Sequence, residues 1–437
     1  MEGIPWFLQS TTKRLKCMKC KVEKAKLTGV ITCPPNKTYT HRAIFLASLA
    51  KGKSVIRNVL LSRDTIATIN ACKALGAEIN IDGSTVTVES IGKVIPQRSE
   101  IDAANSGTTI RISAAIAALS DTKIILTGDS SLKKRPMQPL LDSLVKLGAT
   151  CTSTDGMPPI TVKGKILGGN TNISGSVSSQ FISALLMAAP KTEKGITLEI
   201  EDDLVSKPYL DATVATMKKF GASVNTILPY KKYNIPKQDY KPIDFTVPAD
   251  FSSAALLLSA AVLIGDNMSI ITPAGDLPQG DKEMLTHLEK LGVQVNIGDV
   301  ITVKSPQLLK GGRFDLSNTP DLLPSIAILA LKTSKPIEIF NVRHARFKET
   351  DRIAILAQEL SKLGMNVTEK EDGLILDAPG IIKSAELNSF EDHRLFMAFS
   401  IAAMFVGNCT VTDPDSVDVS YPTFIDDMNR IGAKILV

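Results

Sequence analysis

The sequence predicts an α/β protein with two domains, each built from three copies of one unit packed around buried helices. A helix that ends in glycine, followed by a β-rich segment, recurs six times along the 437 residues. A second, strongly apolar helix begins about 40 residues before each of these glycines, which is typical of a buried helix. A chain of this length is also too long for a single hydrophobic core of ordinary size.

The recurring glycines define the repeat. They fall at intervals of about 70 residues, and a basic residue precedes each one in the last helical turn. A glycine there adopts the left-handed backbone that ends a helix, and a nearby cation complements the helix dipole. A fixed period of this kind indicates repeated structural units. The six positions are Gly76, Gly148, Gly221, Gly292, Gly364 and Gly432.

The apolar helices begin at residues suited to N-caps. Asn, Ser, Thr and Asp are enriched at all six starts, because their side chains can accept hydrogen bonds from the first free backbone N–H groups. A strand follows each helix, for example at 124–127 and 196–200. Each unit is therefore predicted as helix, strand, helix and strand, usually with a short second strand. The six starts are predicted near Asn36, Asn105, Ser178, Asp250, Thr319 and Glu391.

The domain boundaries follow from the three-and-three division of the units. Segment 230–242 is polar, contains proline and lacks a helical period, so we expect it to approach a domain crossing. The first domain is predicted over 35–246, and the second over 27–34 together with 247–437. Residues 1–26 lack the continuous apolar region of a secretory signal and are expected to form a disordered, dispensable basic leader.

Charge and composition exclude several classes of protein. The formal net charge is +5, but seven Lys and Arg residues lie in the leader, so the remainder is close to neutral. This argues against nucleic acid as a partner, and no apolar run is long enough to span a membrane. The six scattered cysteines indicate a reducing compartment, the cytoplasm, rather than a disulfide framework. The pair Cys17 and Cys20 lacks the second pair of a zinc site, so no metal is expected.

Several apolar helices begin beside cations. A helix N-terminus carries free N–H groups and a partial positive charge, which together attract anions. The hydroxyl and amide groups of 178–180 could cradle a phosphate without adding charge. Capping alone could explain each Ser or Asn, but an unpaired Arg beside a core is costly. The cations are Lys37, Arg42, Arg111 and Arg394 near helix starts, and Arg135 on a loop.

Segment 343–352 concentrates charge between a predicted strand at 336–340 and a predicted helix at 353–360. It holds four fixed cations, two carboxylates and His344. Connections between a strand and a helix often carry functional side chains, because the scaffold aims them without disturbing the core. The alternative is a solvated, charged helix start.

Seven motifs resemble those of the enolpyruvyl transferase family, most closely its members that act on shikimate 3-phosphate. The resemblance covers nearly the whole chain after residue 28 and implies a two-domain inverted α/β barrel-like fold. Each domain would contain three βαβαββ-type units, with the active site in the cleft between the domains. The motifs lie at 36–42, 105–111, 126–137, 175–180, 206–209, 347–352 and 392–394.

The resemblance implies a transferase of aromatic amino acid and chorismate biosynthesis. Such an enzyme transfers the enolpyruvyl group of phosphoenolpyruvate to the 5-hydroxyl of shikimate 3-phosphate and releases phosphate. The reaction proceeds by addition and then elimination through a tetrahedral ketal. It needs no cofactor, neither metal nor organic, and we expect the chain to act as a monomer. Both substrates are anions, as the inventory of Arg and Lys anticipates.

Site roles carried over from the family fall into two sets. On the shikimate 3-phosphate side, Ser178, Ser179 and Ser206 would hold the phosphate, Lys348 would approach the 5-hydroxyl, Tyr209 would lie against the ring, and Thr38 and Arg42 would bind the carboxylate. On the phosphoenolpyruvate side, the clamp would consist of Arg135, Arg352 and Arg394, with Lys37 and Gln180 between the two ligands.

The resemblance also assigns the chemistry. Asp321 would accept the hydroxyl proton, Glu349 would be the acid and base at the methylene carbon, and Lys37 would assist catalysis. Structural alternatives are a helix-start charge for Asp321 and an ion pair with Arg352 for Glu349. The family further implies that glyphosate competes with phosphoenolpyruvate and that Gly107 leaves room for it.

Two residues differ from the family pattern, and two other classes of protein are alternatives to this assignment. Ser420 stands where the family often has a lysine that reaches phosphoenolpyruvate, and His344 stands where relatives often have Asn. A UDP-N-acetylglucosamine enolpyruvyl transferase would carry a cysteine in the loop at 128–134, which has none. An RNA 3′-phosphate cyclase-like protein would require a nucleophilic histidine and a basic surface.

Overall fold

The computed structural model of the chain describes residues 19–273, 275–378 and 380–437. These residues form two compact units: unit 1 is 35–247, and unit 2 comprises 19–34 and 248–437. The predicted division at 246 lies one residue from the observed one. No described helix is both long and apolar enough to cross a membrane.

Unit 1 contains three four-stranded sheets with one shared plan. In each sheet the first two strands are parallel, and the third runs antiparallel to both of its neighbours. Listed in order across each sheet, the strands are β14 (Asp244–Thr246), β3 (Lys51–Arg57), β5 (Thr85–Ile91) and β4 (Glu78–Asp82); β6 (Glu100–Asp102), β7 (Ile124–Thr127), β9 (Met157–Lys163) and β8 (Thr150–Thr154); and β10 (Gly169–Ile173), β11 (Ile196–Ile200), β13 (Lys232–Ile235) and β12 (Asn225–Leu228).

Unit 2 repeats this plan three more times, so six copies of one supersecondary unit make up the described chain. Its strands, again in order across each sheet, are β2 (Leu27–Thr32), β15 (Gly265–Ile271), β17 (Val300–Lys304) and β16 (Gln294–Asn296); β18 (Gly312–Asp315), β19 (Ile337–Phe340), β21 (Gly373–Asp377) and β20 (Asn366–Lys370); and β22 (Glu386–Leu387), β23 (Cys409–Thr412), β1 (Lys19–Val22) and β24 (Ile435–Leu436).

Each repeat also contributes two helices, and the predicted alternation is confirmed. The first helix of a repeat is almost wholly buried, whereas the second buries one face. The first helices are α1 (Lys37–Leu49), α3 (Gly107–Ala117), α5 (Ser179–Ala188), α7 (Phe251–Ile264), α9 (Leu323–Leu329) and α11 (His393–Val406). The second helices are α2 (Arg63–Ala74), α4 (Gln138–Lys146), α6 (Lys207–Lys219), α8 (Glu283–Lys290), α10 (Arg352–Lys362) and α12 (Phe424–Arg430).

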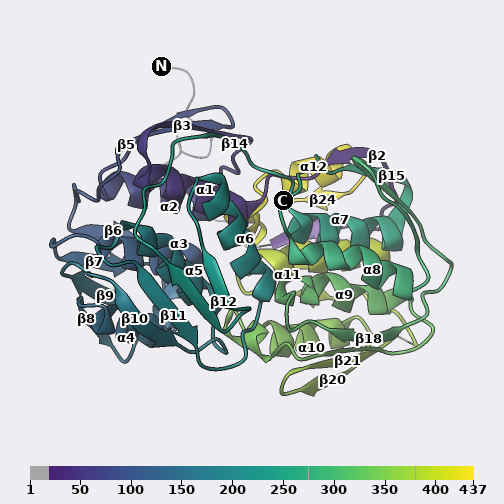
Figure 1. The fold of residues 1–437 in the computed structure, drawn as a ribbon. Helices are drawn as coiled ribbons and strands as arrows, with labels where there is room; N and C mark the ends of the chain where they lie inside the picture. Colours follow the sequence, from purple (N-terminus) through teal and green to yellow (C-terminus); the bar gives the residue numbers. More distant parts are fainter. Residues whose placement is uncertain (1–18, 274, 379) are drawn as a thin grey trace. The chain divides into compact units, whose positions relative to one another are not determined.

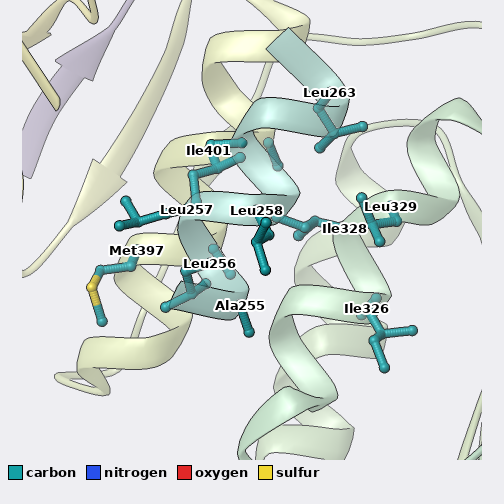
Figure 2. Close-up of a cluster of buried hydrophobic side chains, with 14 of the residues drawn as sticks. Ala255, Leu256, Leu257, Leu258, Leu263, Ile326, Ile328, Leu329, Met397 and Ile401 are labelled. Carbon is teal, nitrogen blue, oxygen red and sulfur yellow. The ribbon is translucent and has the colours of Figure 1, made fainter. Parts of the chain in front are cut away.

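The buried helices of unit 2 pack against one another, as the repeat predicts. Helices α7, α9 and α11 are in mutual contact. Figure 2 shows their side chains meeting: Leu258 of α7 lies beside Ile328 of α9, and Leu257, on the other side of α7, lies on the side of Ile401 of α11. All four of these residues are fully buried. Because every side of α7 is apolar and covered, this helix forms the centre of the unit's core.

The predicted helix ends are also confirmed. Asn36 caps α1 by accepting a hydrogen bond from the Tyr39 N–H at 2.9 Å, and side chains likewise cap α3, α5, α7 and α11. Helix α9 differs, since the 3₁₀ turn η5 (Pro320–Leu322) precedes it and Thr319 provides no side-chain cap. All six repeat glycines have positive φ values. At Gly76 a Cβ atom would lie 2.5 Å from the Ile95 carbonyl oxygen, so this position requires glycine sterically as well.

The prediction of a disordered leader is wrong for residues 19–26. Strand β1 pairs with β23 on one side and β24 on the other, and it fills the third position of the last sheet. In the other five sheets that position belongs to a strand that follows the fourth in sequence. Lys19 and Lys21 face outward, whereas Cys20 and Val22 are 1% and 0% exposed. The two lysines made this half-buried strand resemble a solvated segment in the sequence. Residues 1–18, including Cys17, lie outside the described residues.

Strand β2 continues this N-terminal contribution. It runs parallel to β15, which lies more than 200 residues later, and the purple β2 lies beside the teal β15 in Figure 1. The predicted linker at 230–242 is likewise part of a fold unit, because β13 occupies the third position of its sheet. The Tyr240 hydroxyl donates a 2.9 Å hydrogen bond to the Met187 carbonyl and is buried. The chain passes from one unit to the other after residue 34 and again after residue 247, not within 230–242.

Candidate active site

In unit 1, the starts of α3 and α5 meet beside a loop arginine. A Cβ atom on Gly107 would lie 3.1 Å from the Arg135 guanidinium and 3.4 Å from Gln180 Oε1. Arg111 donates to the same Gln180 oxygen at 2.5 Å, and its guanidinium lies 4.9 Å from the centre of the Phe181 ring. The structure therefore brings together three predicted site residues, Gly107, Arg135 and Gln180.

Hydrogen bonds hold these groups in place. Gln180 donates its amide to Thr108 Oγ1 at 3.0 Å, and Ser178 Oγ accepts from the Gln180 N–H at 3.3 Å. Arg135, which is 7% exposed, donates to Asn105 Oδ1 at 3.0 Å. Because each side chain is held by a neighbouring helix start, the arginine nitrogens and the free N–H groups of the helices lie in one small region.

A second group in unit 1 centres on Arg42, which is 2% exposed. Its guanidinium donates to Thr213 Oγ1 at 2.8 Å and to the carbonyl oxygens of Thr38 and Tyr209, both at 3.1 Å. It also donates to Ser183 Oγ at 3.3 Å. Burial lowers the pKa of Arg42 to about 10, which still leaves it cationic at neutral pH. Three predicted residues, Thr38, Arg42 and Tyr209, thus lie together.

Lys37 begins α1 and is held by a carboxylate that the sequence did not reveal. Its ammonium group lies 3.1 Å from Asp64 Oδ2, and both side chains are largely buried. Beneath this pair, His41 Nδ1 lies 2.7 Å from Thr68 Oγ1, which in turn lies 2.6 Å from Thr109 Oγ1. Burial, followed by the charge of Lys37, holds the pKa of His41 well below its usual range, so the ring is neutral. This network joins α1, α2 and α3 under the site.

Ser179 and Ser206 occupy the starts of α5 and α6. Ser179 is 4% exposed at the first position of α5. Ser206 precedes α6 with φ of 58°, a left-handed conformation that is uncommon for serine. Backbone strain of this kind is often concentrated at ligand sites, because the surrounding structure must over-determine it.

In unit 2, Arg352 is the most heavily paired residue of the site. It is 1% exposed and is bonded to three carboxylates. Its Nε lies 2.8 Å from Asp392, one terminal nitrogen lies 2.9 Å from Asp321, and the other lies 2.7 Å from Glu349. Burial disfavours its charge, but the carboxylates of Asp392, Glu349 and Asp321 together raise the pKa of Arg352 above its usual value.

Asp321 is the second hub of this group. It lies 2.9 Å from Arg352, 3.2 Å from Arg394 and 3.5 Å from Lys348. The contacts of Arg352 and Asp321 therefore bring together all five site residues predicted for unit 2. They are Asp321, Lys348, Glu349, Arg352 and Arg394.

Segment 343–352 is confirmed as a strand-to-helix connection, running from β19 through the 3₁₀ turn η7 (Arg343–Phe347) to α10. Its cations divide into two kinds. Arg343 pairs with Glu371 at 3.1 Å, and Arg346 pairs with Asp351 and Glu369, each at 2.8 Å. Arg343, which is 66% exposed, is solvated as the alternative interpretation held, and Arg346 is 18% exposed; Lys348 and Arg352 belong to the Asp321 group.

The two positions that depart from the family are both buried. His344 is 9% exposed, and burial together with the charge of Lys348 lowers its pKa to about 4. Ser420 follows the 3₁₀ turn η8 (Pro414–Val419) and is 1% exposed. No other described residue hydrogen-bonds its hydroxyl. A buried, neutral group therefore stands where the family often has a cation.

Sequence reasoning missed three carboxylates that organise the site. Asp64 pairs with Lys37, Asp392 holds Arg352 and caps α11, and Asp281 lies buried near Asp321 and Arg394. Asp392 was detectable as a predicted N-cap position within the 392–394 motif. Asp64 and Asp281 carry no sequence signal, because helix-start aspartates are common and their burial depends on tertiary packing.

Both units thus combine helix starts, buried arginines and polar hydroxyls, an arrangement typical of α/β proteins that bind small anions. A model of the EPSP synthase (3-phosphoshikimate 1-carboxyvinyltransferase) family matches residues 22–428. A 3-phosphoshikimate 1-carboxyvinyltransferase of Nitrosopumilus maritimus is 63% identical over 422 residues, which is 96% of this chain and 99% of the relative. One from Methanosarcina mazei is 42% identical over 426 residues, again 96% and 99%.

Solved structures agree with the sequence relatives. An EPSP synthase from Acinetobacter baumannii has a TM-score of 0.80 at 25% identity, covering 96% of this chain and 100% of that one. The enolpyruvyl transferase NikO from Streptomyces tendae shares the fold, with a TM-score of 0.78 at 19% identity over 96% of this chain and 98% of that one. The chain belongs to the EPSP synthase family.

Proposed function

We propose that the chain transfers the enolpyruvyl group of phosphoenolpyruvate to the 5-hydroxyl of shikimate 3-phosphate and releases phosphate. The observation that carries this proposal is the 63% identity to a 3-phosphoshikimate 1-carboxyvinyltransferase over nearly the full length of both chains. The gathered anion-binding groups support it, because both substrates carry phosphate and carboxylate groups.

The proposed shikimate 3-phosphate site uses mainly unit 1. Hydroxyl groups and helix N–H groups at 178–179, with Ser206, would bind the phosphate. Arg42 would bind the carboxylate, with Thr38 beside it, and Tyr209 would lie against the ring. Arg42 is already held by neutral partners, so its orientation is set before the ligand arrives. Such pre-organisation lowers the entropy cost of binding.

The proposed phosphoenolpyruvate clamp consists of Arg135, Arg352 and Arg394, with Lys37 and Gln180 between the two substrates. Guanidinium groups suit this role, because their paired donors match the geometry of carboxylate and phosphate oxygens. Arg394 lies 3.2 Å from Asp321 and Arg352 lies 2.9 Å from it. Binding an anion at these arginines would therefore compete with Asp321 for their donors.

The chemistry is proposed to need proton transfer at two sites. Asp321 would accept the proton of the 5-hydroxyl as its oxygen attacks C2 of phosphoenolpyruvate, and this proton would later leave with the released phosphate. Glu349 would deliver a proton to the methylene carbon, giving a tetrahedral ketal, and would take a proton back from the resulting methyl group as the C–O bond to phosphate breaks. Lys37, held by Asp64, would neutralise charge on the leaving phosphate. General acid and base groups of this kind contribute roughly 10²–10⁴-fold each.

One assay separates this function from the alternatives. Purified protein should release phosphate from phosphoenolpyruvate only when shikimate 3-phosphate is present. UDP-N-acetylglucosamine in its place should give no release, and an RNA with a 3′-phosphate should not be cyclised. Release with the nucleotide sugar alone would refute the proposal.

We further propose that the enzyme works in the cytoplasm as a monomer and has no nucleic acid or membrane partner. The wide spacing of its cysteines and the near-neutral charge beyond the N-terminal segment support this. Light scattering of the active protein at assay concentration tests the oligomeric state directly.

A further inference from the structure

A carboxyl group outside the assigned site residues lies buried in unit 2 next to the Asp321 group. Asp281 is 4% exposed in the 3₁₀ turn η4 (Gly280–Lys282), which precedes α8. Ser252 Oγ donates a hydrogen bond to its Oδ2. Its other oxygen, Oδ1, is buried and has no hydrogen-bond partner among the described residues. A buried carboxylate oxygen without a donor is costly, so its retention calls for an explanation.

The turn that carries Asp281 is firmly held. Gln279 accepts from the Phe251 N–H at 3.1 Å and donates to the Ala249 carbonyl at 2.9 Å, which ties the turn to the start of α7. The Lys282 ammonium lies 5.2 Å from the centre of the Phe251 ring. Asp281 is therefore fixed at a helix start of unit 2 rather than being free to turn toward solvent.

The charged groups that act on Asp281 come from three other elements. They are Asp321 of η5, Arg394 in the first turn of α11, and Asp250, the N-cap of α7. Burial, and next the charge of Asp321, raise the pKa of Asp281 to about 7, against the lowering effects of the Ser252 hydrogen bond and Arg394. The group therefore changes charge near neutral pH.

Asp321 needs such a neighbour if it is a base. It contacts three cations, at 2.9 Å, 3.2 Å and 3.5 Å. Nearby positive charges favour the ionised carboxylate and so weaken its hold on a proton. A second carboxylate in the same low-dielectric region has the opposite effect, because two adjacent negative charges repel.

We infer that Asp281 is a positioning residue whose negative charge maintains the basicity of Asp321 for the transfer reaction. This inference rests on the proposed function, in which Asp321 accepts the 5-hydroxyl proton. Asp281 touches no substrate in this scheme. Its charge acts through Asp321, and it also weakens the attraction of Arg394 for an anion.

The test compares wild-type protein with Asp281→Asn, measuring kcat with both substrates saturating from pH 5.5 to 8.5. Asparagine keeps the shape and can accept the Ser252 hydrogen bond, but it cannot ionise. At pH 8.5 the variant should be slower, by at most about tenfold for each unit by which the pKa of Asp321 falls, because the rate of proton transfer follows only part of a change in basicity. At pH 5.5, where Asp281 is itself protonated, the two proteins should turn over at similar rates. The KM for phosphoenolpyruvate should stay level or fall.

Ser252→Ala provides a second, independent measurement. Loss of the hydrogen bond that favours the ionised form should shift the rise of kcat to higher pH without removing it. Glu289→Gln is the matched control, because Glu289 is an exposed carboxylate on α8, the helix that follows the same turn. It should leave the pH profile unchanged.

The outcomes separate this inference from the proposed function. If wild-type protein releases no phosphate, the proposed function fails. Suppose instead that wild-type protein is active and that its kcat exceeds the kcat of Asp281→Asn by the same factor at pH 5.5 and at pH 8.5. Asp281 then has no electrostatic role, and the inference is wrong. A higher KM for phosphoenolpyruvate together with a lower melting temperature would show a purely structural residue. The inference instead expects Asp281→Asn to raise the melting temperature more at pH 8.5 than at pH 5.5, because the cost of the buried carboxyl group grows as the pH rises from its unfolded-state pKa to its higher folded-state pKa.

Discussion

A chain shortened to begin at Lys26, which lacks strand β1 (Lys19–Val22), should fail to fold unit 2. Strand β1 provides four residue pairs with β23 and two with β24, and its loss would leave both neighbours with open edges. Val22 and Cys20 lie in the core at 0% and 1% exposure. The backbone of the following residues is also anchored, since the Ala25 N–H donates to the Met404 carbonyl at 3.1 Å.

The expected magnitude follows from burial and hydrogen bonding. Burying one aliphatic side chain contributes about 2 kcal/mol, so Val22 and Cys20 together contribute about 4 kcal/mol. Each lost backbone hydrogen bond costs about 1 kcal/mol net, and the strand makes several. The sum approaches the entire stability of a typical domain, about 5–15 kcal/mol. Exposed edges on β23 and β24 would in addition promote aggregation.

Point substitutions make the same test without shortening the chain. Val22→Ala removes two buried carbon groups and should lower the free energy of unfolding by about 2 kcal/mol. Lys21→Ala on the same strand is the control; Lys21 is 59% exposed, so the change should stay within about 0.5 kcal/mol. Urea unfolding followed by circular dichroism measures both. Equal effects of the two substitutions, or full stability of a chain that begins at Lys26, would refute the assignment of β1 to the core.

Three further predictions concern the site and the pH dependence of stability. Glu349→Gln should reduce turnover by roughly 10²–10⁴-fold and should slow deuterium wash-in to the enolpyruvyl group equally; weaker binding with unchanged exchange would leave Glu349 a structural partner only. Gly107→Ala places a methyl group 3.1 Å from Arg135, so the inhibition constant of glyphosate should rise more than the KM for phosphoenolpyruvate, whereas equal rises would contradict this placement. Burial lowers the pKa of His287 to about 4, so its contribution to stability is complete above about pH 6.5 and is lost as the pH falls toward 4. Between pH 7.5 and 5 this loss is about 2 kcal/mol for wild-type protein, and His287→Leu should lose correspondingly less in urea unfolding at the two pH values.

The repeat was predictable because its signals are local. A glycine such as Gly76 must follow a helix, and a cap such as Asn36 must precede one, so short stretches of sequence report both. Six copies of the same pattern then predicted six structural units. The apolar residues of α7 showed a buried helix for the same reason.

Features that depend on distant parts of the chain could not be predicted this way. Strand β1 is four residues long; its partner β23 lies nearly 400 residues later and its partner β24 more than 400 residues later. Two lysines in four residues favoured a solvated segment, and no nearby residue indicates that this segment fills the third position of a sheet formed by the end of the chain. The pairing of Lys37 with Asp64 is similar, since it depends on how α1 and α2 pack.

The Asp321 group shows why fold and site cannot be separated in unit 2. Arg352 is the first residue of α10, Asp392 is the N-cap of α11, and Asp321 lies in the turn that leads into α9. One guanidinium therefore joins the starts of three helices, at 2.8 Å and 2.9 Å to the two aspartates. Lysine at 352 would keep the charge but offer one nitrogen in place of three, leaving at least one buried carboxylate without its donor. Removing a partner of a buried charge costs about 3–5 kcal/mol. The contacts of Arg352 that would help to clamp an anion are therefore also the contacts that fix the starts of α9, α10 and α11 relative to one another.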